Sequence, residues 1–168
     1  HVEGEWEHPT LVLEPWQIFV IVNVFGFRHA YASRGRQGAR RFDIAYIEVA
    51  RKNGKSAWTS GIALYCLCCE DEVGPQVKTA ATTGDQARIV FRVAKAMVEK
   101  TPDLADAFDL DAMANAVVCR QNMGSIQPIN AKASTQDGLN PSCTIVDELH
   151  AHKDRKLFDV LRSARGAR

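Results

Sequence analysis

The chain has 168 residues, of which 46% are hydrophobic and 24% are charged, and its formal net charge at pH 7 is +1. A chain of this length and composition is able to bury a core as one globular domain. It lacks the overall basic excess that proteins held mainly by phosphate contacts usually carry.

The apolar runs are too short to predict a membrane-spanning helix. The most apolar run, residues 18–27, is interrupted by Asn23 and Gly26, whereas a span needs about 18 to 20 apolar residues without a break. The first ten residues are acidic and do not resemble a signal peptide. We therefore expect no contact with a membrane.

The N-terminal part predicts a helix, a basic loop and a strand. Residues 13–27 form an apolar run with Pro15 near its start, so we expect either a buried helix or a helix in an edge layer. Residues 33–41 combine glycines with arginines and form a loop. Residues 41–50 are β-branched and apolar between loop residues, which predicts a buried strand.

The middle of the chain alternates between helical and extended patterns. Residues 55–69 are predicted as a helix, residues 70–75 as a turn and residues 76–83 as a second short strand. Residues 85–100 are amphipathic and predict another helix. Its apolar stripe is expected to contain Ile89, Val93, Ala96 and Met97.

The last part predicts a third buried strand and a closing helix. Residues 115–121 and 125–132 are candidates for short strands, and residues 134–142 form a loop. Residues 143–148 begin with four residues that suit a central strand, and residues 153–165 form an amphipathic helix. Strand and helix thus alternate three times, which predicts an α/β fold with a mostly parallel sheet and ligands beyond its carboxyl edge.

The cysteines predict buried, reduced thiols. Three of the five lie within the helix predicted at residues 55–69, at spacings that do not direct thiolates at one metal ion. Reduced cysteines are typical of a reducing compartment such as the cytosol.

The arginine-rich loop at residues 33–41 has two interpretations. It carries no acidic residue, and its arginines are Arg34, Arg36, Arg40 and Arg41. A solvated loop is the simpler interpretation, and a contact with the phosphates of DNA is the alternative.

Residues 49–56 have the order expected of a phosphate-binding loop. A predicted strand delivers the chain, Gly54 makes a turn and a helix begins, so backbone N–H groups and the helix N-terminus would face one anion. Lys55 would then reach the β- and γ-phosphates, and Ser56 would give its hydroxyl to Mg²⁺. The usual pattern has a glycine where Val49 stands, so a simple turn that contains a lysine is the alternative.

Two acids follow the third predicted strand. Asp147 and Glu148 end the run CTIVDE, residues 143–148, which has the pattern of a Walker B segment. In that role Asp147 holds Mg²⁺, and Glu148 orients and deprotonates the attacking water. Alternatively, the pair caps the following helix, where acids favour the positive end of the dipole. The phosphate loop and this segment together indicate a nucleotide hydrolase.

His150 and His152 come directly after these acids. No third histidine lies nearby in the sequence, so surface histidines on a helix are expected rather than metal ligands. The run DELH also matches the D-E-x-H box of some helicases.

Four segments in order resemble one protein family. LEPWQIFVIVNVFGF, AYIEVARKNGKS, AATTGDQARIVF and PSCTIVDELHAH are similar to consecutive parts of the large terminase subunit of tailed bacteriophages, the ATPase that drives genomic DNA into capsids. The resemblance covers nearly the whole chain. It implies a P-loop NTPase fold of the RecA-like, ASCE type, in which residues 1–168 form part of the ATPase domain and the sheet is incomplete at the C-terminus.

The resemblance also implies roles for individual residues. The family's phosphate loop commonly lacks the first glycine and carries an arginine near its start, which places Arg51 at the γ-phosphate. The family's adenine-recognising segment corresponds to residues 11–27, where the Gln17 amide would pair with the base and Trp16 is a candidate for stacking. The expected ATP-binding residues are Gln17, Arg51, Lys52, Asn53, Gly54, Lys55 and Ser56. The expected Mg²⁺ ligands are Ser56 and Asp147, and the expected catalytic residues are Glu148, Lys55 and Arg51.

Further elements and partners are implied in the same way. A coupling segment and an RNase H-like nuclease domain would follow Arg168. The expected partners are double-stranded DNA, the capsid portal protein, the small terminase subunit and further copies of the chain in a ring, in the cytoplasm of the infected bacterial host. The family also uses an arginine from a neighbouring subunit, for which the candidates are Arg120, Arg162 and Arg165.

Two other functions stay open at this point. A helicase-like ATPase would share DELH and the upstream glutamine, although helicases of that class usually carry G-x-G-K-[ST] where this chain has Lys52-Asn53 before Gly54. A non-catalytic nucleotide-binding module is the other alternative, but it would have no need of a water-activating carboxylate at Glu148.

Overall fold

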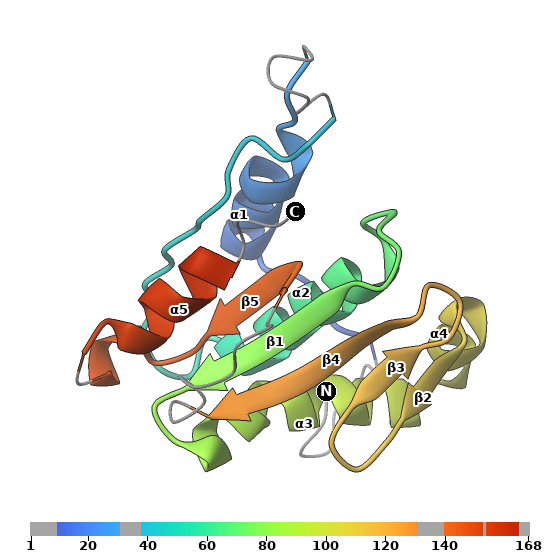
Figure 1. Cartoon of the computed structure of the whole chain (residues 1–168). Coiled ribbons are helices and arrows are strands. Elements are labelled where there is room, and N and C mark those ends of the chain that lie inside the picture. The colour runs from blue at the N-terminus through green and yellow to red at the C-terminus, as the bar shows by residue number, and fades with distance from the viewer. Residues whose placement is uncertain (1–9, 31–37, 131–139, 153, 165–168) are drawn as a thin grey trace.

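The fold is an α/β arrangement around one sheet. The computed structural model describes residues 10–30, 38–130, 140–152 and 154–164. Within them, a five-stranded sheet carries helices on both faces (Figure 1). The predicted α/β class is confirmed. None of the helices in these ranges is long and apolar enough to cross a lipid bilayer.

The sheet has the strand order β2-β3-β4-β1-β5. β1 pairs in parallel with β4 and β5, whereas β3 pairs antiparallel with β2 and β4. The sheet is therefore mixed and not mostly parallel, because short turns rather than helical crossovers join β2, β3 and β4. The strands are β1 (Gln76–Ala81), β2 (Leu110–Ala112), β3 (Val117–Cys119), β4 (Gly124–Asn130) and β5 (Cys143–Val146).

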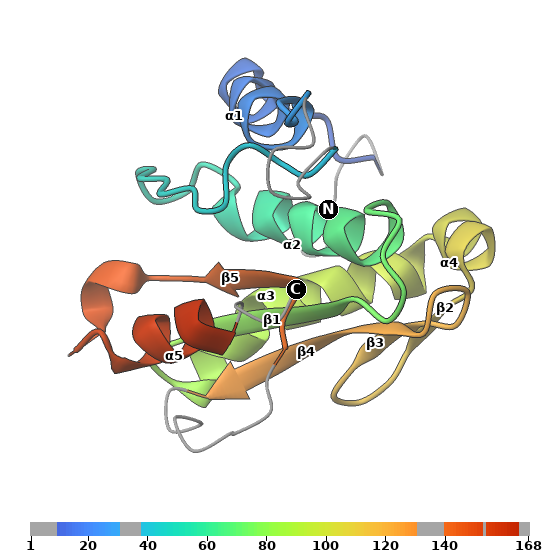
Figure 2. The same ribbon diagram turned by 45° about the horizontal axis from the view of Figure 1, so that its top comes forward.

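The helices form layers on both sides of the sheet. α2 and α3 cover one face, α1 lies outside α2, and α5 lies on the opposite face beside β5 (Figure 2). Their positions confirm the helices predicted from the sequence. The α-helices are α1 (Pro15–Gly26), α2 (Lys55–Cys68), α3 (Gly84–Lys100), α4 (Pro102–Phe108) and α5 (Lys156–Ala164), and a 3-10 helix, η3, spans Leu149–Ala151.

The main core lies between the sheet and the α2–α3 layer. Successive side chains of a strand point to opposite faces, and Val77, Val117 and Ile126 point toward these helices. They pack against helix side chains that include Ala63, Leu67, Phe91, Ala94 and Val98. This core fixes the position of α2, whose first turn carries the candidate phosphate loop.

A smaller core lies on the other face of the sheet. Ala80 and Ile129 follow the opposite alternation and pack against Leu157 and Leu161 of α5. Val146, the last residue of β5, contacts the same cluster. The closing helix is thereby held beside the end of β5.

The buried face of α3 differs from the predicted stripe. Ile89 is exposed, and Val93 is only partly buried. The predicted and the observed buried faces both have helical spacing. Small residues on the observed face let α3 approach β1 closely. The Ala87 carbonyl there accepts a hydrogen bond from Thr79 Oγ1 at 2.9 Å. The buried residues of α3 are Ala87, Val90, Phe91, Ala94 and Val98.

The buried strand predicted at residues 41–50 is not formed. The segment has no regular secondary structure, and Phe42, Ile44 and Tyr46 are exposed. A strand forms only where a neighbour completes its hydrogen bonds, and no strand among the described residues pairs with this segment. The β-branched composition favours a strand, but it does not supply the neighbouring strand that would pair with it.

Among the described residues β5 lies at the edge of the sheet, whereas its sequence predicts a buried, central strand. It pairs with β1 on one side, and its residues are only partly buried. Its alternation is nevertheless that of a core strand, because Cys143 and Ile145 pack against the main core and Val146 against the smaller one.

α1 occupies the edge layer, one of its two predicted positions. Gln17 is its buried residue, whereas Phe19 and Val22 are exposed. Its contacts with α2 are aromatic: Trp16 meets Trp58 edge to face with ring centroids 5.1 Å apart. Phe25 meets Tyr65 at the same centroid distance.

Substitution of valines on α3 tests which face is buried. Val90→Ala removes two buried methyl groups at a residue that is 1% exposed, and we expect it to lower the free energy of unfolding by about 2 kcal/mol. The matched change Val93→Ala is expected to cost less than about 1 kcal/mol, because this side chain is only partly buried. Urea unfolding measures both, and equal losses would contradict the observed orientation of α3.

Candidate nucleotide-binding site

The candidate phosphate loop leads directly into α2. Gly54 caps the helix with φ 68° and ψ 17°, in the left-handed region, and Lys52 also has positive φ. The Asn53 side-chain amide donates to the Ala50 carbonyl at 3.1 Å and closes the turn. Lys55 is the first helical residue, so its amine starts from the end of the helix that carries partial positive charge.

The candidate Walker B acids directly follow β5. The Asp147 N–H donates to the Ala80 carbonyl at 2.8 Å and extends the pairing with β1. Asp147 Oδ1 accepts a hydrogen bond from the Glu148 N–H at 3.0 Å. Glu148 adopts the left-handed conformation, with φ 51° and ψ 47°, and turns the chain into η3.

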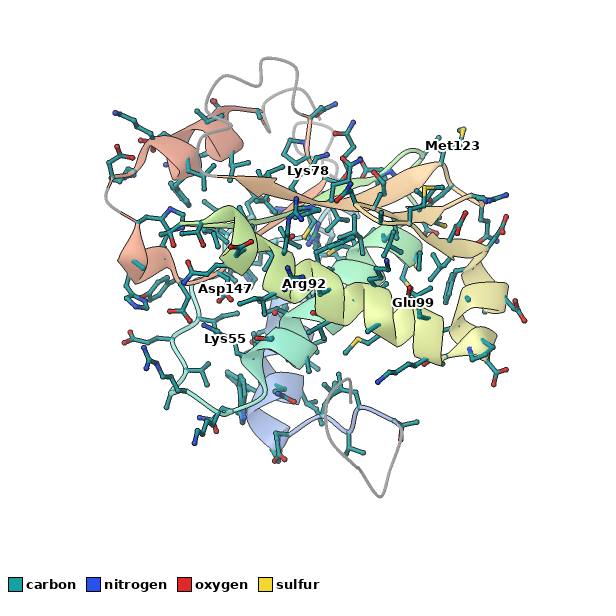
Figure 3. The ribbon with its side chains drawn as sticks, turned by 90° about the horizontal axis from the view of Figure 1, so that it is seen from below. Lys55, Lys78, Arg92, Glu99, Met123 and Asp147 are labelled. Atoms are coloured by element: carbon teal, nitrogen blue, oxygen red, sulfur yellow. The ribbon has the colours of Figure 1, made fainter. Side chains whose placement is uncertain are left out.

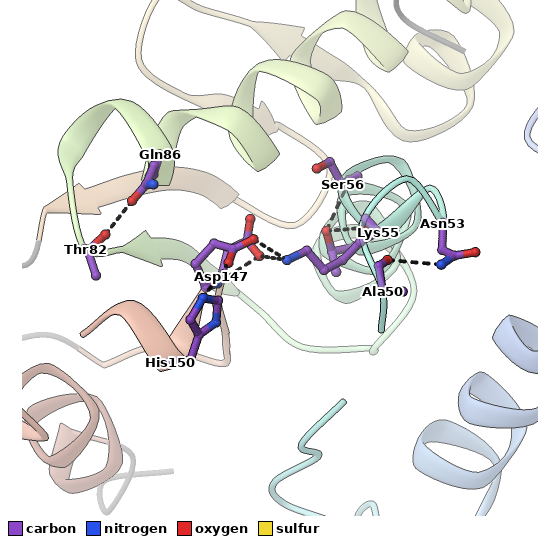
Figure 4. A network of polar contacts seen from close by, with 10 residues as sticks. Ala50, Asn53, Lys55, Ser56, Thr82, Gln86, Asp147 and His150 are labelled. Carbon is purple, nitrogen blue, oxygen red and sulfur yellow. Dashed lines mark hydrogen bonds and ion pairs between the residues drawn. The ribbon is translucent and has the colours of Figure 1, made fainter. Parts of the chain in front are cut away.

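The fold brings the two segments together. Lys55 Nζ lies 2.8 Å from Asp147 Oδ1 and 2.7 Å from Glu148 Oε1. Figure 3 shows Lys55 and Asp147 approaching each other from α2 and from the end of β5, and Figure 4 shows the ammonium group between the carboxylates. The juxtaposition expected from the sequence is therefore observed.

These contacts raise the pKa of Lys55 and lower the pKa of Glu148. Burial alone lowers the pKa of Lys55, but the hydrogen bonds and charges of Asp147 and Glu148 outweigh it and raise the pKa. The hydrogen bond from Lys55 lowers the pKa of Glu148, assisted by the nearby charges of Lys55, His150 and Arg51. At neutral pH Lys55 is thus an ammonium group and Glu148 is ionised.

A groove of about 880 Å³ opens beside this contact. Residues 42–52 form one wall and β5 forms another, with Ile145 on the β5 side and Leu161 contributed by α5. Of the predicted site residues, the groove is lined by Arg51, Lys52, Gly54, Lys55, Ser56, Asp147 and Glu148.

Two predicted ATP-binding residues do not line the groove. Asn53 is engaged within the turn. Gln17 is buried, and its Oε1 accepts from the Glu14 N–H at 2.9 Å as a cap of α1. Its Nε2 lies close to the loop, 3.8 Å from where a Cβ on Gly54 would stand. Contact of Gln17 with a base stays a prediction.

His150, predicted as a surface histidine, contacts Glu148. Its Nε2 lies 3.4 Å from Glu148 Oε2, and its side chain is largely exposed. The predicted surface position is therefore observed, on η3 rather than on an α-helix. His152 follows η3, and its Nε2 is buried with no hydrogen-bond partner in the described structure.

Thr82 and Gln86 follow β1 and were not singled out by the sequence. Their side chains form a hydrogen bond to each other, drawn in Figure 4, but neither residue lines the groove. The signal that identifies such residues is their position just after a predicted strand, since parallel strands end at one edge of the sheet.

Metal ligation fits the donors of this site. Mg²⁺ prefers oxygen ligands and usually takes one or two carboxylates together with phosphates and water. Asp147, Glu148 and Ser56 supply oxygen atoms at one end of the groove. In the described ranges no cluster of three or more His, Cys, Asp or Glu residues forms a metal cage.

The cysteines are reduced, but they are not all buried. Cys66 and Cys119 are buried, whereas Cys69 is exposed. Contact with Cys143 and burial raise the pKa of Cys66, and burial raises the pKa of Cys68 to about 12. These thiols are therefore protonated at neutral pH.

The arginine-rich loop is described only at its C-terminal end. Arg40 Nε lies 3.3 Å from Glu70 Oε2, and its guanidinium group covers the Phe25 ring at 5.2 Å. Arg41 lies over Phe42. Arg34 and Arg36 lie outside the described residues, so the interpretation as a DNA contact stays a prediction.

The candidates for an arginine acting between subunits differ in position. Arg120 is paired with Asp111 at 2.8 Å, on the β2–β3 side of the sheet. Arg162 of α5 lines the groove. Arg165 lies outside the described residues.

Comparison with known proteins decides the family. The family model for the ATPase domain of the terminase large subunit matches residues 15–167. The chain belongs to this family. The match confirms the resemblance carried by the four segments and leaves the helicase interpretation without support.

A bacteriophage relative agrees with this terminase assignment. The terminase large subunit of Enterobacteria phage HK97 is 29% identical over 128 residues, which are 74% of this chain and 25% of that protein. The crystal structure of the HK97 large terminase matches with a TM-score of 0.77 and 26% identity, over 96% of this chain and 32% of that one. The terminase domain described here thus spans about a quarter to a third of these relatives.

Replacing Gly54 tests the left-handed turn of this terminase domain. Gly54→Ala is expected to lower the free energy of unfolding by about 1 to 2 kcal/mol, since an L-residue is strained at φ 68°. The control Gly61→Ala lies inside α2, where a Cβ meets only Leu11 at an ordinary 3.7 Å, and is expected to be neutral or stabilising by up to about 1 kcal/mol. Chemical denaturation measures both, and a stabilising Gly54→Ala would contradict the loop conformation.

Proposed function

We propose that this terminase domain binds ATP with Mg²⁺ in the groove and hydrolyses it to drive double-stranded viral DNA into a capsid. The observation that carries the proposal is the meeting of Lys55 with Asp147 and Glu148 at the N-terminus of α2. Phosphate-transfer sites of the P-loop type need a lysine at the start of a helix, close to Walker B acids at the end of a neighbouring strand. Membership of the terminase ATPase family supports ATP as the nucleotide.

Phosphate binding is assigned to the loop and the first turn of α2. The helix N-terminus and the turn at Gly54 present backbone N–H groups that suit phosphate oxygens. Lys55 binds the β- and γ-phosphates as a point charge. Arg51 lies at the groove wall and contributes positive charge near Glu148, which suits a contact with the γ-phosphate. Lys52 and Asn53 shape the turn.

Ser56 and Asp147 are the proposed ligands of Mg²⁺. The ion, when bound, neutralises phosphate charge and orients the triphosphate. Ser56 lies in the first turn of α2 and lines the groove, and the pairing with β1 holds Asp147 in place. Both supply oxygen, the donor that this ion prefers.

Glu148 is proposed as the general base. Its lowered pKa keeps the carboxylate ionised at neutral pH, so it is able to accept a proton from the water that attacks the γ-phosphorus. ADP is the leaving group, and the proton stays on Glu148 until it is released to solvent. A site that only binds nucleotide has no use for this second acid.

Gln17 is proposed to recognise the base. Its buried amide lies beside Gly54, close to the phosphate loop, and an amide offers both a donor and an acceptor to adenine. Its current acceptor role at the cap of α1 would be exchanged for the base.

The proposed partners follow from the packaging role. They are double-stranded DNA, the capsid portal protein, the small terminase subunit and further copies of the chain in a ring, in the cytoplasm of an infected bacterium. The HK97 relatives are longer than this domain, so a coupling segment and a nuclease domain in the whole protein belong to the same proposal.

ATP binding by the purified chain tests the assignment of Lys55 and Asp147. Lys55→Ala is expected to weaken MgATP binding by about tenfold or more, because a charge-assisted hydrogen bond to phosphate is lost. Asp147→Ala is expected to weaken binding only when Mg²⁺ is present. The control Lys95→Ala removes the same charge from α3, where Lys95 pairs with Glu99. Calorimetry measures the affinities, and an unchanged value for Lys55→Ala would contradict the proposal.

Turnover tests the role of Glu148. Glu148→Gln is expected to retain MgATP binding and to lower the rate of phosphate release by roughly 100- to 10,000-fold, since the general base is removed. Glu99→Gln, on the exposed side of α3, is the matched control. The rate is measured in this chain and in a longer chain with downstream sequence. Release by the longer chain alone would show that this domain binds without hydrolysing, and full activity of Glu148→Gln in either chain would refute the assignment.

A further inference from the structure

Lys55 engages both carboxylates at the proposed metal position. Its Nζ contacts Asp147 Oδ1 at 2.8 Å and Glu148 Oε1 at 2.7 Å. Asp147 Oδ1 also accepts the Glu148 N–H at 3.0 Å. A carboxylate oxygen has about two lone-pair sites, so this oxygen already has two donors.

A divalent cation and this ammonium group compete for the same two carboxylates. Mg²⁺ binds carboxylate oxygen at about 2.0 to 2.1 Å, and positive charges this close repel each other most where solvent is partly excluded. The side chains of Lys55 and Asp147 are 32% and 12% exposed. The ammonium group of Lys55 therefore disfavours a cation at Asp147 for as long as the contact is kept.

The lysine is the partner that is able to move. The main chain of Asp147 directly follows β5 and is fixed by the hydrogen bond from its N–H to the Ala80 carbonyl. Lys55 reaches the acids through a flexible four-carbon chain from the first turn of α2. Within the part of the chain that the structure describes, the polar contacts of its ammonium group are those with Asp147 and Glu148.

We propose that Lys55 closes the metal site until a triphosphate draws its ammonium group away, so that metal and nucleotide bind as a pair. This inference rests on the proposed function and gives the same lysine a second, regulatory role. A triphosphate at the N-terminus of α2 offers new oxygen acceptors to Lys55, and the exchange frees Asp147 for the metal and Glu148 for water. By linkage, nucleotide raises the affinity for metal by the factor by which metal raises the affinity for nucleotide.

Titration with Mn²⁺ tests the proposal without any need for turnover. Mn²⁺ accepts the same oxygen ligands, and its free form is counted by electron paramagnetic resonance. We expect the unaltered chain to bind Mn²⁺ weakly by itself, and about tenfold or more tightly when a non-hydrolysable ATP analogue is present. Lys55→Met, which keeps the side-chain length without the charge, is expected to bind Mn²⁺ alone about tenfold or more tightly than the unaltered chain.

Control variants locate the effect. Lys95→Met makes the same change on α3 and is expected to leave Mn²⁺ binding as it is. Adding Asp147→Asn to Lys55→Met is expected to abolish the gain, because the metal loses its ligand. Lys55→Gln serves as a second neutral variant, and circular dichroism verifies that each variant is folded.

The outcomes separate this inference from the proposed function. Equal Mn²⁺ affinity in the unaltered chain, Lys55→Met and Lys55→Gln would overturn the closing role of Lys55. An ATP analogue that binds without changing the affinity for Mn²⁺ would overturn the coupling but leave the proposed nucleotide site intact. An analogue that does not bind the unaltered chain would refute the proposed function itself.

Discussion

The contact of Lys55 with the carboxylates of Asp147 and Glu148 joins the two parts of the fold on which the site depends. One part is the turn that starts α2, and the other is the carboxyl end of an edge strand. The main core holds α2 against the sheet, and the smaller core holds α5 beside β5. With both elements fixed, a flexible lysine is sufficient to bridge them, and the groove opens next to the bridge.

The elements that could be predicted are those whose pattern is local. α2 and β1 have uninterrupted patterns of their own, and the structure places them where the sequence does. Residues 41–50 differ because a strand forms only when a second segment pairs with it. Residue composition indicates a tendency to be extended, but it does not show which segment would be the partner. The rotation of α3 was also beyond prediction, since periodicity allows two stripes and the closeness permitted by Ala87 and Ala94 selects one.

The site could be predicted where motif order carries it. The sequence itself shows a turn with Gly54 before a helix and two acids after a strand. Lys55, Asp147 and Glu148 were therefore expected to meet. Residues that only the tertiary structure places at the site could not be predicted, because no local sequence pattern marks them. Leu161 lines the groove because α5 packs beside the end of β5, and Gln17 serves its own helix as a cap, a role that competes with base recognition.

The packing of Trp58 gives the domain a built-in optical probe. This indole lies one turn beyond Lys55, is 1% exposed, and meets Trp16 edge to face. Its N–H has no hydrogen-bond acceptor within the described structure, and its burial shields the indole from water, so we expect blue-shifted emission. Any rearrangement of the first turn of α2 changes this environment, and the intrinsic fluorescence of the unlabelled protein reports it.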